Sequence, residues 1–207
     1  PLAPPLCVCG EIYLTLPYLE LGRWSWRGGE PARGGGAHAH GDVAFTIWLD
    51  PQLAIQQAAT IRDAFVRRWG DHAAEFESGF QALEKDLLAL DADLEKGFAA
   101  LGKQPMVGSH PVYQYLARRY ALNLESVHWE PDEAPDEILW RALEDILEAH
   151  PARIMLWEGA PIVETKTKLA EKGIQSIVFD PCGNRPESGD FLSVMQHNVS
   201  ELDASGK

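Results

Sequence analysis

Three predicted β-strands each end directly before a side chain that can bind a metal ion. The runs and the residues that follow them are 105–109 and His110, 153–157 and Glu158, and 175–179 and Asp180. Each run precedes a helix-like segment, and this β-α-β-α alternation predicts a parallel sheet. The carboxyl ends of parallel strands lie at one edge, where open α/β sheets bind ligands. One imidazole and two carboxylates at that edge favour a site for a divalent cation.

The same side chains have structural roles that the sequence leaves open. His110 could instead cap the following helix, and Asp180 could accept the backbone N–H groups of its own turn. Glu158 could brace the loop after its strand. Glu130, after a predicted strand at 126–129, is a candidate carboxylate at a fourth strand end.

A glycine-rich loop at 34–41 carries two more candidate ligands, His38 and His40. A His-x-His pair on mobile backbone can capture a borderline cation such as Zn²⁺. We expect this loop to be mobile without metal, because glycine maximises the entropy of the chain. Its glycines are not followed by the Gly-Lys-Ser/Thr of a phosphate-binding loop. Structural roles are expected for three histidines on or beside predicted helices: His72, His150 and His197.

The composition is that of a soluble, acidic globular protein. Of 207 residues, 45% are hydrophobic and 24% are charged, and the net charge is -13. This charge disfavours nucleic acid and anionic membrane surfaces as partners, because phosphate groups are bound by clustered Lys and Arg. It mildly favours the approach of cations. No apolar stretch has the length of a bilayer-spanning helix.

Sequence motifs for nucleophilic or zinc-dependent catalysis were not found. The chain has no Gly-x-Ser-x-Gly and no His-Glu-x-x-His, so we predict that it is not an enzyme. Its cysteines, Cys7, Cys9 and Cys182, match no four-ligand zinc motif. The first six residues lack the basic and apolar regions of a signal peptide, and none is visible in this sequence.

The chain is predicted to have three parts: an N-terminal segment at 1–47 with the Gly/His loop, a helical linker at 48–104, and a C-terminal β/α lobe at 105–207. Asp50 followed by Pro51 marks the start of a helix, with Asp as the N-cap. Apolar residues three and four apart then predict a long helix over 71–101. We expect its apolar stripe, from Phe76 to Leu101, to pack within the chain.

The lobe from 105 onward is predicted to alternate strands with helices. The strands are expected at 105–109, 126–129, 153–157 and 175–179, and the helices at 111–121, at 135–149, from 161 onward and at 190–202.

From Trp48 onward, the sequence resembles the metal-binding solute receptors of bacterial ABC importers, the zinc/manganese group. The resemblance is carried by the order and spacing of several short segments, and the His-containing loop ahead of the first segment fits the zinc branch. The segments are Trp48-Leu-Asp-Pro51, Ser109-His110 with Tyr115-Leu-Ala-Arg-Arg-Tyr120, Glu158 before Pro161, Phe179-Asp-Pro-Cys-Gly183, and Gly189-Asp-Phe-Leu-Ser-Val-Met-Gln-His-Asn198.

This resemblance implies an α/β fold of two lobes joined by a long rigid helix, with the metal between them. It implies His110 and Asp180 as ligands, and it places Glu158 at a position that is usually structural in the family. The family has a histidine where this chain has Thr46, so His38 or His40 could supply that ligand. The N-terminal lobe is either missing from this chain or divergent.

We therefore expect a monomeric extracytoplasmic or periplasmic receptor that captures Zn²⁺, with Mn²⁺ as the alternative ion, and delivers it to an ABC permease in the membrane. An alternative is a degenerate or metal-free interaction protein on the same fold. A metal-dependent hydrolase is a third interpretation, which would require an open coordination position and Glu158 as the base.

Overall fold

The structure of the protein is a computed structural model that describes residues 44–206. His38, His40 and the loop at 34–41 lie outside the described residues. The elements, in chain order, are η1 (Ile47–Leu49), α2 (Pro51–Arg68), η2 (Gly70–His72), α3 (Ala73–Leu101), β1 (Met106–Gly108), α4 (Gln114–Arg119), β2 (Leu124–Ser126), α5 (Glu137–Ala149), β3 (Ile154–Trp157), α6 (Val163–Glu171), β4 (Gln175–Val178) and α7 (Phe191–Ser205). Among these, no helix has both the length and the apolar character that crossing a membrane requires.

The strands of the described region form one four-stranded sheet in the order β2-β1-β3-β4. All neighbouring pairs are parallel, with Met106 opposite both Leu124 and Ile154, and Ile154 opposite Gln175. The predicted α/β class and the parallel sheet are therefore confirmed. The carboxyl ends of all the strands lie at the same edge, because parallel strands run in the same direction.

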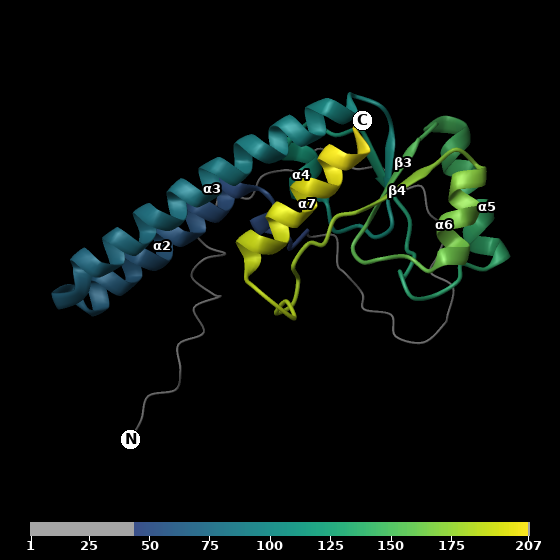
Figure 1. Cartoon of the computed structure of the whole chain (residues 1–207). Coiled ribbons are helices and arrows are strands. Elements are labelled where there is room, and N and C mark those ends of the chain that lie inside the picture. The colour runs from purple at the N-terminus through teal and green to yellow at the C-terminus, as the bar shows by residue number, and fades with distance from the viewer. Residues whose placement is uncertain (1–43, 207) are drawn as a thin grey trace, which may run out of the picture. The chain divides into compact units, whose positions relative to one another are not determined.

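Helices cover both faces of this sheet, as Figure 1 shows. Successive side chains of a strand point to opposite faces. Met106 therefore joins the core under α3, α4 and α7, while Val107 joins the core under α5 and α6. Burial on both faces explains why the strand at 154–157 is wholly apolar.

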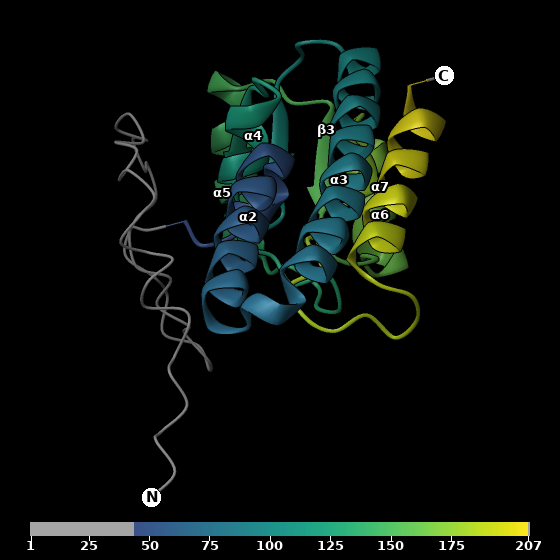
Figure 2. The ribbon, with the colours of Figure 1, turned by 90° about the vertical axis from the view of Figure 1, so that its left-hand side faces the viewer.

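Two helices, α2 and α3, form a hairpin beside the sheet, and α3 also packs on α7 (Figure 2). Asp50 starts α2 as predicted, because its Oδ1 accepts hydrogen bonds from the backbone N–H groups of Gln52 and Leu53. The two helices α3 and α7 approach closely at Gly97, where an added Cβ would lie only 3.2 Å from the Leu202 side chain.

The predicted long helix is confirmed, since α3 runs unbroken from Ala73 to Leu101. Its apolar stripe enters the core only in its second half, from Leu87 to Leu101. In the first half, Leu83 is 38% exposed, and Phe76 packs against Phe65 of α2 with ring centroids 5.4 Å apart. Among the described residues, the first half packs against α2, so it also packs within the chain as predicted, but it is less buried than the second half.

Two predicted elements differ from the observed ones. The strand expected at 126–129 begins earlier, at Leu124, because Leu124 pairs with the first residue of β1. The helix expected at 111–121 is shorter, since the chain first makes a turn in which Val112 N donates to His110 O at 2.9 Å. Residues 102–105 connect α3 to β1. The predicted boundaries between the three parts of the chain, at 47 and 104, stay a prediction.

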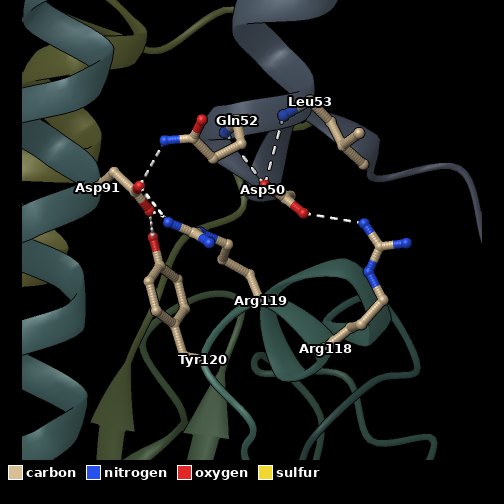
Figure 3. A network of polar contacts seen from close by, with 7 residues as sticks. All are labelled: Asp50, Gln52, Leu53, Asp91, Arg118, Arg119 and Tyr120. Atoms are coloured by element: carbon tan, nitrogen blue, oxygen red, sulfur yellow. Dashed lines mark hydrogen bonds and ion pairs between the residues drawn. The ribbon is translucent and has the colours of Figure 1, made fainter.

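A polar network joins the helical hairpin to α4, as Figure 3 shows. Asp91, on α3, accepts hydrogen bonds from Arg119, from Gln52 at 2.8 Å and from Tyr120 at 2.9 Å. Asp50 accepts a separate bond from Arg118 at 2.9 Å. The two acids thus hold three helices together at one point.

The pKa of Asp91 lies below its ordinary value of 3.8 because of this network. Burial opposes ionisation of the carboxyl group, but the hydrogen bonds from Arg119, Gln52 and Tyr120, together with the charge of Arg119, outweigh it. A depressed native pKa means that folding is favoured by the ionised form.

We expect Leu87→Ala to lower the free energy of unfolding by about 2–5 kcal/mol, the range for truncating a core leucine. Leu88→Ala is the matched control, because Leu87 is 3% exposed and Leu88 is 47% exposed. The control should change the free energy of unfolding by less than about 0.5 kcal/mol. Urea denaturation of both variants checks this, and equal losses would show that the stripe is not buried within the chain.

Asp91→Asn should lower the free energy of unfolding by about 1.5–3 kcal/mol at neutral pH, since it weakens hydrogen bonds to a charged acceptor. The contribution of the parent carboxylate is present above pH 3.8 and is lost as the pH falls through the lower native pKa. The difference between parent and variant should therefore shrink below pH 3.8. Urea denaturation at neutral and acidic pH measures it, and a constant difference would contradict the assigned pKa direction.

Candidate metal centre

The backbone of Ser109 aligns the ends of three strands. Its N–H donates to Leu156 O of β3 at 2.8 Å, and its carbonyl accepts from Trp129 N, beyond β2, at 2.8 Å. The ladder therefore continues one residue past β1 on both sides. The residues that follow these positions, His110 and Glu130, emerge next to each other.

His110, Glu130 and Glu158 form a cluster at this edge. His110 Nε2 lies 3.8 Å from Glu130 Oε1, and His110 Nδ1 lies 3.4 Å from Glu158 Oε1. One ligand atom from each residue can be chosen so that all three lie within 4.8 Å of one another. The ring of His128 packs edge-on against that of His110, with centroids 5.3 Å apart. The cluster thus places the His110 imidazole between two carboxylates.

Burial differs sharply within the cluster. The side chains of His110 and Glu158 are 13% and 25% exposed, whereas that of Glu130 is 54% exposed. The side chains of His110 and Glu158 are therefore mostly buried, while that of Glu130 is open to solvent.

Asp180 lies at the carboxyl end of β4, at the same edge, but it is not a member of this cluster. Its Oδ1 accepts a hydrogen bond from Cys182 N at 2.7 Å, which is the structural role that the sequence left open for it. Its backbone is bound twice by the Asn198 side chain of α7.

Tyr113 connects the His110 turn to the end of β4. Its buried hydroxyl donates to Phe179 O at 2.8 Å, one residue before Asp180. Burial raises the pKa of Tyr113 well above its ordinary value, and the negative charges of Glu158 and Asp180 raise it further. Tyr113 therefore ties the His110 turn to the strand that ends just before Asp180.

The chain packs closely around Gly108 at this turn. A Cβ at this position would lie 3.1 Å from Tyr113 Cδ2 and 3.2 Å from His110 O. The glycine directly before Ser109 thus allows the aromatic ring and the His110 backbone to approach the strand.

Thr46 has a structural role in this structure. Its buried hydroxyl donates to Val112 O, in the turn after His110. The residue at the position where the resemblance expects a histidine therefore links the start of the helical hairpin to the candidate site. The loop histidines that could supply a ligand in its place lie outside the described residues.

Glu130 is the member of the cluster that sequence analysis ranked below the strand-end residues His110, Glu158 and Asp180. The available signal was its place after a fourth predicted strand. This signal was weak because the strand was predicted at 126–129, whereas β2 ends at Ser126. The hydrogen bond from Trp129 N to Ser109 O, which brings Glu130 beside His110, is a tertiary contact.

The donor atoms suit a borderline divalent cation. Imidazole nitrogen and carboxylate oxygen are both common zinc ligands, and the same set also accommodates Mn²⁺. The cluster could hold such an ion through His110 and an adjacent carboxylate, with further positions open to other groups.

The sequence pattern of the family "zinc-uptake complex component A, periplasmic" (ZnuA) matches residues 20–205. The chain belongs to the ZnuA family. This family consists of zinc-uptake components and not of enzymes, in agreement with the prediction from the sequence.

Two relatives illustrate the sequence similarity. The zinc-binding protein AdcA of Streptococcus pyogenes serotype M6 is 24% identical over 172 residues, which are 78% of this chain and 33% of that protein. The high-affinity zinc uptake system protein ZnuA of Brucella abortus is 26% identical over 156 residues, which are 73% of this chain and 46% of that protein. The chain thus matches less than half the length of either relative.

A solved structure shares the ZnuA-like fold. The zinc-bound ZnuA-like domain of Streptococcus pneumoniae AdcA superposes with a TM-score of 0.70 at 22% identity. The match covers 82% of this chain and 66% of that chain. At this level of identity, the likeness establishes the fold.

Tyr113→Phe should lower the free energy of unfolding by about 1–3 kcal/mol, because it leaves the Phe179 carbonyl without its donor in a buried place. Tyr115→Phe is the control, since Tyr115 lies only two residues away and is partly buried. Its effect should be smaller than about 0.5 kcal/mol. Urea denaturation of the two variants measures this, and equal effects would argue against the Tyr113 link.

Proposed function

We propose that this chain is an extracytoplasmic zinc receptor that captures Zn²⁺ at the carboxyl edge of its sheet. The observation that carries the proposal is the meeting of His110 with Glu130 and Glu158 in a member of a zinc-uptake family. The residues come from three different strand ends, so only the folded chain can assemble them. Mn²⁺ is the alternative ion for this donor set.

Asp180, His38 and His40 are the proposed sources of the remaining coordination. Asp180 is supported by its place at the carboxyl end of β4, at the same edge as His110. The two histidines are supported by their place in the predicted glycine-rich loop, a few residues before the first described residue in the sequence. Water completes any position that these groups leave open.

The proposed mechanism is capture without catalysis. A neutral imidazole nitrogen and ionised carboxylates bind the cation directly. The net charge of -13 favours the approach of a cation to the protein. The helix α3 packs closely against α7 and the sheet. We therefore expect the described part of the chain to move only slightly when it binds the cation.

We propose delivery to an ABC-type permease from the periplasmic side of the membrane. The support is the family description, which names a periplasmic component of a zinc-uptake complex. The specific permease partner and the expected monomeric state belong to this proposal.

The test is titration calorimetry of chelator-stripped protein with zinc. His110→Ala should weaken zinc binding by more than about 100-fold, because removing even the indirect partners of a metal ligand typically costs 10–100-fold. His72→Ala and His197→Ala are suitable controls, since both side chains are exposed and lie outside the cluster. His150 is a poorer control because its Nε2 lies 2.8 Å from Met106 O of β1.

Equal zinc affinities for the parent, His110→Ala and the controls would exclude the assigned site. A parent chain that binds no zinc would instead favour the alternative prediction, a degenerate or metal-free interaction protein on the same fold.

A further inference from the structure

We infer that Glu130 and Glu158 have different roles toward the ion: Glu130 binds it beside His110 Nε2, and Glu158 orients the ring through His110 Nδ1. This inference rests on the proposed function and assigns separate roles to the two glutamates of the proposed zinc site. It assigns a direct ligand to a loop carboxylate and a positioning role to a strand-end carboxylate.

The geometry of the imidazole separates the two carboxylates. Glu130 Oε1 lies 3.8 Å from Nε2, and Glu158 Oε1 lies 3.4 Å from Nδ1. The two ring nitrogens point their lone pairs in diverging directions, so a single ion binds only one of them. The other nitrogen of a metal-binding histidine usually donates its N–H to a carboxylate or carbonyl. One glutamate therefore lies on the metal side of the ring, and the other lies on the donor side.

Burial identifies the metal side as Nε2. The Nδ1 atom of His110 is buried, and the Glu158 side chain beside it is 25% exposed. Glu130, beside Nε2, is 54% exposed. A cation arrives from solvent with its hydration shell, and it meets the exposed carboxylate and the adjacent nitrogen first.

The distance between His110 and Glu130 is compatible with one shared ion. Zinc lies about 2.0–2.2 Å from nitrogen and oxygen ligands, so two of its ligand atoms are separated by less than about 4.4 Å. The 3.8 Å between Nε2 and Glu130 Oε1 meets this limit without any movement of the backbone.

The backbone around Glu130 is anchored, although its side chain is exposed. On one side, Trp129 is buried and donates its backbone N–H to Ser109 O. On the other side, Pro131 O accepts from Ile162 N at 2.9 Å. A Cβ at Gly159 would lie 3.3 Å from Pro131 Cγ, so the loop after Glu158 packs directly against the Glu130 loop.

Calorimetry with zinc on glutamine and alanine variants separates the two roles. Glu130→Gln should weaken zinc binding by about 10-fold or more, because a neutral amide replaces a charged ligand. Glu158→Ala should weaken it by about 10–100-fold, and Glu158→Gln should restore part of that loss, because the amide oxygen still accepts from Nδ1–H. Glu133→Gln, which removes the same charge from the same loop, should leave affinity within about twofold of the parent.

Nitrogen NMR of ¹⁵N-histidine protein loaded with ¹¹³Cd²⁺ gives a readout that stability changes do not affect. The His110 signals are identified by their loss in His110→Ala. We expect direct coupling of cadmium to Nε2, with Nδ1 carrying the proton, in the parent and in Glu158→Gln. Coupling to Nδ1 would overturn the inference, as would a Glu130→Gln variant that binds zinc as tightly as Glu133→Gln.

The two levels of proposal fail in different ways. If zinc binding is lost in His110→Ala but unchanged in Glu130→Gln, the site stands and the division of roles is wrong. If His110→Ala binds zinc like the parent, or the parent does not bind it, the proposed function and this inference both fall.

Discussion

The backbone hydrogen bonds of Ser109 are the constraint on which the candidate site depends. They join the end of β1 to β3 through Leu156 and to the segment after β2 through Trp129. Because these strands are parallel, the chain leaves all of them at one edge, and the next side chains meet there. The positions of His110 and Glu130 therefore depend on the sheet as well as on the loops that carry them.

The helical hairpin is tied to this edge by polar contacts that a hydrophobic core alone would not provide. Asp50 and Asp91 hold Arg118 and Arg119 of α4, and Thr46 holds the turn after His110. A buried acid with several donors is costly to leave unpaired, so this arrangement selects one position of the hairpin relative to α4. The same residues therefore serve both the stability of the fold and the placement of the His110 turn.

The donor set of the described residues is rich in carboxylates. One imidazole is flanked by two glutamates, and Asp180 stands at the next strand end. Thr46, at a position where the resemblance expects histidine, is engaged in a structural hydrogen bond. The groups that we propose for the ion in the described residues are therefore mostly oxygen donors, and carboxylate oxygen suits manganese as well as zinc.

The sequence by itself determined the fold class, the parallel alternation, the Asp50 cap and the length of α3, because these follow from local periodicity, capping and turn chemistry. It also placed His110, Glu158 and Asp180 at one edge. Only the tertiary structure decided that Glu130 joins His110 and Glu158 while Asp180 engages its own turn, and that the stripe of α3 is buried only from Leu87 onward. Those outcomes depend on strand register and on which element lies opposite, and neither is encoded in the spacing of residues along one segment.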